Sequence, residues 1–194
     1  MARRCSLFVW SAVCALVFAC GSEEASGPSR TDLLAQSRAA LEADDWSATL
    51  SHARRALTLH GEDAEALYLA ARAAVQLNKL KDTFEFLTRA EATHPKGALL
   101  AQLSTIRGQA LFKRYGELGA EGDRALASAA LQQGTQAGEL RADAAYLLAV
   151  LQDMKGHKND AQQRKFGKLF LSLEPDSERA TKLRAYLTQK GLLP

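Results

Sequence analysis

The sequence predicts an all-α protein in which antiparallel helix pairs stack into a solenoid. After residue 30 it is rich in alanine, leucine, glutamine, arginine and glutamate and lacks β-branched runs, a composition that favours helices. The same region repeats with a period of 34 residues. This period is typical of helix pairs that bury their apolar faces only by stacking on neighbours. We expect three to four such pairs and a C-terminal capping helix.

Residues 1–19 have the layout of a bacterial secretory signal peptide. Arg3 and Arg4 give a positively charged start, and an uncharged apolar run over Leu7–Ala19 follows. This run is well short of the ~20 residues that a permanent transmembrane helix needs. We therefore expect an exported protein.

Cys20 follows this run directly and is the expected lipidation site. Residues 17–20 (Val-Phe-Ala-Cys) resemble a lipobox, whose cysteine carries diacylglycerol and a fatty acid such as palmitate. Phe18 departs from the usual small or aliphatic residue, so ordinary cleavage after Ala19 is the alternative. Gly21 resembles the sorting signal that sends Gram-negative lipoproteins to the outer membrane, facing the periplasm. No cysteine follows residue 20, so the folded part has no thiol for a disulfide or a metal.

Residues 20–30 should form a flexible tether, because they contain glycine, serine, glutamate and proline and no large apolar side chain. We expect a helical repeat domain over 31–175, which is long enough for a continuous core. A capping helix should occupy 176–194.

The first two repeat units occupy residues 30–63 and 64–97. A shift of 34 residues superposes Arg38 on Arg72 and His60 on His94. The large, small and turn residues follow a pattern that resembles the tetratricopeptide repeat (TPR) family. The matching positions are Leu33, Ser37, Trp46, Ala56 and Gly61 in the first unit, and Leu67, Ala71, Leu80, Ala90 and Pro95 in the second. The departures are Thr49 and Thr83 in place of alanine, Ala40 and Ala74 in place of tyrosine, and Gln36 at an apolar position.

Beyond residue 97 the pattern loosens. An apolar stripe from Leu99 to Ala110 predicts a helix, the glycines of 116–122 predict a long turn, and Arg124–Gln133 should form the partner helix. Leu140–Lys155 and Asp160–Leu173 should form a fourth pair. Asp176 or Ser177 should cap the last helix, which Gly191 ends.

No motif predicts catalysis, and we expect no catalytic residue, cofactor or metal. His60 and His94 are one repeat apart and lack a third ligand. The glycines of 116–122 lack the Gly-Lys-Ser/Thr of a phosphate loop, and no nucleophile elbow or His-Glu-x-x-His motif occurs. Asp44 and Asp45 lie where the TPR family has its inter-helix turn.

The resemblance implies that the first helix of each pair lines a concave groove that binds a protein partner. We expect Arg38 and Arg72 to stack there and Tyr68 and Tyr146 to face one trough. Arginine and tyrosine often carry binding energy at interfaces. The alternative is that the arginines only keep the alanine-rich helices soluble. The chain lacks the carboxylate clamp of chaperone-binding members. The expected groove residues are Leu34, Arg38, Leu41, Tyr68, Arg72, Val75 and Tyr146, with Glu42, Gln76, Val150 and Asp153 beside them.

The C-terminal part is basic, with nine lysines and arginines against four acidic residues over 155–194. This asymmetry favours weak contact with an anionic surface such as lipid or cell wall, and the alternative is a solvated outer face. Nucleic acid is not an expected partner, because aromatic residues are not interleaved with the basic ones.

Together these features predict a non-enzymatic, membrane-anchored periplasmic lipoprotein that acts as a protein interaction scaffold. Anchored repeat proteins of this kind resemble assembly helpers of pili, secretion channels or motility complexes. The alternatives are a regulatory or adaptor subunit of an envelope enzyme, such as a cell-wall hydrolase, and a structural adaptor that associates with itself.

Overall fold

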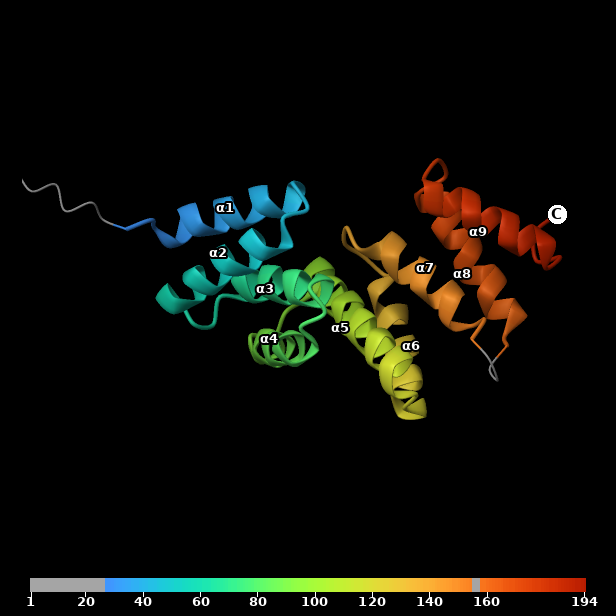
Figure 1. Cartoon of the computed structure of the whole chain (residues 1–194), viewed down its shortest axis with the longest axis horizontal. Helices are drawn as coiled ribbons and strands as arrows, with labels where there is room; N and C mark the ends of the chain where they lie inside the picture. The colour runs from blue at the N-terminus through green and yellow to red at the C-terminus, as the bar shows by residue number, and fades with distance from the viewer. Residues whose placement is uncertain (1–26, 155–157) are drawn as a thin grey trace, which may run out of the picture.

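The computed structural model describes residues 27–154 and 158–194, so the expected signal peptide, Cys20 and most of the tether lie outside the described residues. The described ranges contain nine α-helices and no strand (Figure 1). None of these helices has the length and apolar character that crossing a membrane requires. The helices are α1 Arg30–Glu42, α2 Trp46–Leu59, α3 Ala64–Gln76, α4 Leu80–Ala92, α5 Gly97–Leu118, α6 Glu121–Gly134, α7 Arg141–Leu151, α8 Asp160–Leu173 and α9 Glu178–Gln189.

The helices form a solenoid of pairs, as the repeat period predicts. Each helix from α1 to α9 packs against the next along the chain, and α1, α3, α5 and α7 also contact one another in series. Four pairs result, and α9 packs on α8 at the end of the stack. Figure 1 shows the stack curving from α1 to α9, with α2, α4 and α6 on its outer side. The all-α solenoid is therefore confirmed.

The first two pairs share backbone detail as well as sequence. Asp44 and Asn78, 34 positions apart, both adopt positive φ values, 55° and 56°. Asp45 lies in the inter-helix turn and caps α2 by accepting a hydrogen bond from the Ala48 N–H at 2.9 Å. Thr49 and Thr83 are fully buried, and each hydroxyl donates to the backbone carbonyl four residues earlier. This local bond explains how threonine replaces alanine in the core.

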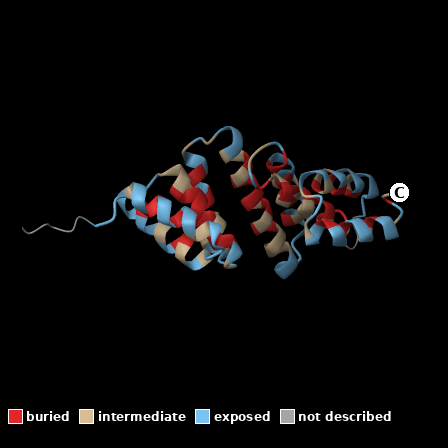
Figure 2. Ribbon diagram, turned by 90° about the horizontal axis from the view of Figure 1, so that it is seen from above, coloured by how far each residue is buried: buried red, intermediate tan, exposed pale blue. Residues whose placement is uncertain are grey.

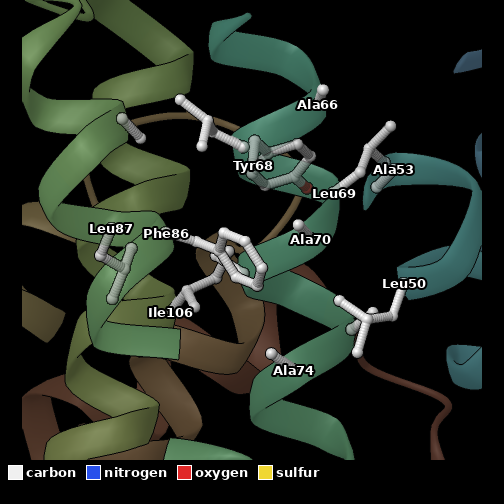
Figure 3. Close-up of a cluster of buried hydrophobic side chains, with 14 of the residues drawn as sticks. Leu50, Ala53, Ala66, Tyr68, Leu69, Ala70, Ala74, Phe86, Leu87 and Ile106 are labelled. Carbon is white, nitrogen blue, oxygen red and sulfur yellow. The ribbon is translucent and has the colours of Figure 1, made fainter. Parts of the chain in front are cut away.

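Helix α3 is the centre of the N-terminal core. It is buried on most of its surface, because α1, α2, α4 and α5 all contact it. Figure 3 shows Leu50 and Ala53 of α2 on one side of α3, with Phe86 and Leu87 of α4 and Ile106 of α5 on the other. Its many alanines allow this close approach from several directions. Figure 2 shows that the buried residues lie where the helices pack against one another, whereas the outward faces of the helices are exposed.

The third pair differs from the expected long turn over 116–122. Helix α5 continues through Gly116 to Leu118, and only Gly119 and Ala120 separate it from α6. Gly119 has a φ of 68°, which suits the left-handed end of a helix. The helix extends because Arg114, near its end, forms a two-bond ion pair with Asp123 of α6 and stacks on Phe84 of α4 at 4.7 Å. The expected turn was therefore too long.

The last helices form a second core cluster. Leu131 of α6 packs there with residues of α7, α8 and α9, including Leu148, Phe170 and Leu187. Ser177, rather than Asp176, caps α9 by accepting a hydrogen bond from the Ala180 N–H at 3.1 Å. Leu140, just before α7, is 5% exposed and does not belong to this second cluster. It packs in the N-terminal core around α3, which we also call the N-terminal cluster.

Candidate functional site

The inner surface of the stack is the candidate site. It is formed by the first helices of the pairs (α1, α3, α5 and α7), with side chains of α9 at its C-terminal end, and we call it the concave surface. Three depressions lie along it, with volumes of about 290, 280 and 270 Å³. We call them the N-terminal, middle and C-terminal depressions.

The N-terminal depression is polar and lies between α1, α3 and the loop that precedes α7. Two ion pairs within the chain hold four of its charged residues. Arg38 of α1 forms an ion pair with Glu65 of α3. Arg72 and Tyr68 of α3 both donate hydrogen bonds to Glu139 of the loop. The lining residues are Arg38, Leu41, Glu42, Glu65, Tyr68, Leu69, Arg72 and Glu139.

Tyr68 is the most buried polar group of this depression, with 7% of the residue exposed. Burial raises the pKa of its phenol well above the usual value, and the hydrogen bond to Glu139 shifts the pKa in the same direction. Arg72 opposes this shift, and its Nη1 lies 2.8 Å from the Tyr68 oxygen. The phenol therefore keeps its proton at neutral pH and acts as a hydrogen-bond donor.

Tyr146 of α7 separates the other two depressions and lines both. Its ring lies 5.2 Å from the Phe170 ring, and Arg179 of α9 stacks over both rings at 5.4 and 5.5 Å. Arg179 is itself held by Asp143 and Glu174. The other residues that line the middle depression are Gln76, Gln109, Phe112, Lys113, Asp143, Leu147 and Arg179. The C-terminal depression adds Ala149, Val150, Asp153, Gln163, Lys182, Leu183 and Tyr186.

The structure places five of the seven expected groove residues at these depressions, namely Arg38, Leu41, Tyr68, Arg72 and Tyr146. It buries the other two in the N-terminal core, where Leu34 is 4% and Val75 0% exposed. The first helices of neighbouring pairs contact each other. A side chain that points from one of them toward the next is therefore covered by that next helix. Leu34 and Val75 therefore support the core and offer no surface to a partner.

Arg38 of α1 and Arg72 of α3 line the same depression, and each pairs with a different glutamate. Tyr68 and Tyr146 both lie on the concave surface but line different depressions of it. Three residues of the site were not expected from the sequence: Glu139, which lies in an irregular loop, and Arg179 and Tyr186 of α9. The last two were accessible to prediction, because α9 continues the series of inner helices.

Groups for metal chemistry do not gather in the described part of the chain. Nowhere in residues 27–154 and 158–194 do three or more His, Cys, Asp or Glu side chains lie close enough together to hold a metal ion. His60 and His94 line separate hollows at the ends of their pairs, away from the concave surface. What the concave surface offers is paired charges, aromatic rings and aliphatic side chains, which suit recognition of another molecule.

Comparisons with known proteins support the fold. No family model matches the chain, and no curated protein matches it. Among solved structures, the crystal structure of MamA protein is similar, with a TM-score of 0.58 and 19% sequence identity. The match covers 84% of this chain and 83% of that chain. Because MamA contains tetratricopeptide repeats, the match shows a TPR-like all-helical solenoid.

Proposed function

We propose that this protein is a non-enzymatic interaction scaffold of a bacterial envelope and that its concave surface binds another protein. The observation that carries the proposal is the aromatic and aliphatic surface around Tyr146, open on two sides along the inner helices. Tyrosine and arginine are the residue types that dominate binding energy at interfaces. Tyr146 is held in place by Phe170 and Arg179, so binding costs little side-chain freedom.

A helical or extended segment of the partner fits this surface best. Phe112 and Leu147 provide apolar contacts in the middle depression, and Val150 and Leu183 do so in the C-terminal depression. Apolar side chains spaced along one face of a segment would fill the two hollows in turn, as in other helix-in-groove contacts. The charged residues at the rims would then fix the register.

The second part of the proposal is that a lipid on Cys20 anchors the scaffold at the outer membrane, facing the periplasm. The charged start, the short apolar run and the cysteine that follows it support this part. Mass spectrometry of the purified chain tests it. We expect an acylated Cys20 at the N-terminus and membrane fractionation that Cys20→Ala abolishes. A leader that remains attached, or a cleaved chain without a lipid, would contradict it.

The experiment for the binding surface is photo-crosslinking in cells. A photo-reactive residue at Val150, beside Tyr146, should crosslink a defined partner, and Tyr146→Ala should remove that product. The matched control is a photo-reactive residue at Leu126 of α6, which is 58% exposed and lies outside the concave surface. Equal products at both positions, or a product at Val150 that Tyr146→Ala leaves unchanged, would reject the concave surface as the binding site.

The identity of the crosslinked protein then decides the kind of scaffold. A component of a pilus, secretion or motility complex fits an assembly helper. An envelope enzyme would instead make the protein a regulatory subunit, and a second copy of the chain would make it a structural adaptor.

A further inference from the structure

The N-terminal depression contains a carboxylate-binding arrangement that the chain fills with its own side chain. Tyr68 and Arg72 lie one helical turn apart on α3 and donate to the same carboxylate oxygen of Glu139. Arg72 Nη1 also donates to the Tyr68 oxygen at 2.8 Å. A guanidinium and a hydroxyl that converge in this way bind a carboxylate strongly, because both hydrogen bonds are charge-assisted.

These two donors are held in place by the fold. Tyr68 belongs to the N-terminal core, and the Arg72 side chain is only 19% exposed. The Arg72 guanidinium lies 6.0 Å above the Tyr68 ring, so the pair is ordered on α3 itself. A ligand that meets donors already in position loses little affinity to ordering them.

Glu139 is held differently, because packing fixes its backbone while its exposed side chain is held only through the carboxylate. Gly138 has a φ of 85° and lies against α5, where a Cβ atom would come within 2.7 Å of Gln102 Cγ. Leu140 is anchored in the N-terminal cluster. The Glu139 side chain between them is 54% exposed. Its carboxylate can therefore leave Arg72 by side-chain rotation alone.

We propose that Arg72 and Tyr68 bind an acidic side chain of the protein partner, and that Glu139 occupies this site until the partner displaces it. The inference rests on the proposed function and adds the chemistry of the partner, which is a segment that carries Asp or Glu. A single carboxylate fits better than a phosphate group, because Glu42 and Glu65 line the same depression and repel a second negative charge.

Because Glu139 occupies the site, the protein binds its partner with a lower apparent affinity. The site accepts a ligand only during the fraction of time for which Glu139 has left it. Glu139 thus acts as a built-in competitor, and it selects partners whose carboxylate comes with further contacts along the concave surface. Removing the Glu139 charge should strengthen binding, whereas removing the Arg72 charge should weaken it.

Fluorescence anisotropy of the full chain in detergent micelles tests this inference. The probe is a labelled peptide, Gly-Ser-Glu-Leu-Glu-Ser-Gly, with blocked ends, and the same peptide with glutamine in place of glutamate is the control ligand. We expect Glu139→Gln to bind the acidic peptide about threefold to tenfold more tightly than the unsubstituted chain. Arg72→Gln should bind it about tenfold or more weakly.

Two further variants keep the test decisive. Tyr68→Phe removes one donor but keeps the buried ring, so it should weaken binding without unfolding α3. Glu91→Gln removes a comparably exposed glutamate from the Arg107 pair outside the concave surface, and it should bind like the unsubstituted chain. Equal affinity of Glu139→Gln and the unsubstituted chain, or unchanged affinity of Arg72→Gln, would overturn the inference.

The proposed function and this inference fail separately. If photo-crosslinking at Val150 captures a partner that Tyr146→Ala loses, while Glu139→Gln changes neither capture nor peptide affinity, the scaffold stands and the occupancy by Glu139 is rejected. If no partner depends on Tyr146 but the peptide affinities shift as expected, the carboxylate site stands alone.

Discussion

Gly108 of α5 lies against Leu131 of α6 so closely that a Cβ atom at Gly108 would be 2.5 Å from Leu131 Cγ and 3.2 Å from its backbone nitrogen. Leu131 is fully buried, and α5 and α6 make the most extensive contact of any two helices in the described stack. The absence of a side chain at Gly108 therefore sets the distance between the two helices of the third pair.

Gly108→Ala should destabilise the fold, because the gain of about 1 kcal/mol in helix propensity is smaller than the cost of separating α5 from α6, about 1–3 kcal/mol and more where backbone must move. Gly116→Ala in the same helix is the matched control. Nothing lies within 4 Å of its Cβ position, so it should stabilise the protein. Urea unfolding followed by circular dichroism gives both values. A stabilising Gly108→Ala would contradict the close contact.

Lys79→Asp should stabilise α4. Lys79 lies 34 residues after Asp45 and occupies the same cap position, but it makes no side-chain cap bond, whereas Asp45 caps α2. An aspartate there should accept a hydrogen bond from the Asp82 N–H and raise the free energy of unfolding by about 0.5–1 kcal/mol. Asp45→Ala should lower it by about 1 kcal/mol, since it removes the existing cap. If Lys79→Asp has no effect while Asp45→Ala destabilises, the two turns are not equivalent.

Acid should weaken the third pair through Asp123. The hydrogen bond from Arg114 lowers the pKa of this carboxyl below its usual value. Its contribution to stability is therefore present above the unfolded-state pKa, near 4, and is lost as the pH falls through the lowered folded-state pKa. Asp123→Asn should cost about 1 kcal/mol near pH 7, allowing for the partial exposure of Arg114, and much less near pH 3.

Thermal unfolding at both pH values measures this difference. The control is Asp176→Asn, which replaces an exposed carboxylate that makes no ion pair within the described residues. It should shift both melting temperatures little. A loss of stability in Asp123→Asn that is as large near pH 3 as near pH 7 would mean that the ion pair is not responsible.

The basic side of α8 should bind anionic vesicles weakly. Arg164, Lys165 and Lys168 are exposed and form no ion pair in the described part of the chain. Replacing Lys165 and Lys168 with glutamate in the Cys20→Ala chain should reduce flotation with phosphatidylserine vesicles by about tenfold or more, at about 1 kcal/mol for each charge. Added salt should act in the same direction. Replacing Arg55 and Lys81 with glutamate is the charge-matched control, and an equal loss in that variant would exclude a specific basic face.

The helix pairs were predictable because a 34-residue period is typical of helix pairs that stack on their neighbours. The family resemblance placed the first inter-helix turn at Asp44 and Asp45, and the helical stripes gave α7, α8 and α9 with small errors at their ends. The length of α5 was not predictable from its glycines, because Gly116 is tolerated inside a helix when Arg114 has partners on α4 and α6. Those partners depend on the three-dimensional arrangement.

The candidate site was predictable only in part. Tyr68, Arg72 and Tyr146 reach the concave surface because helical spacing fixes the direction of a side chain from its own axis. Whether such a side chain stays open depends on the neighbouring helix, which covers Val75. Glu139 follows no period, because its place beside Arg72 depends on how one loop folds back over α3.

Leu140 has a consequence for how the protein melts. Solenoids whose hairpins touch only their neighbours tend to fray one unit at a time from the ends. Here the residue that starts the fourth pair is embedded in the core built by helices α1 to α5. Peeling away the C-terminal helices would pull Leu140 out of that core, so we expect the two ends of the molecule to lose their structure in a single cooperative transition.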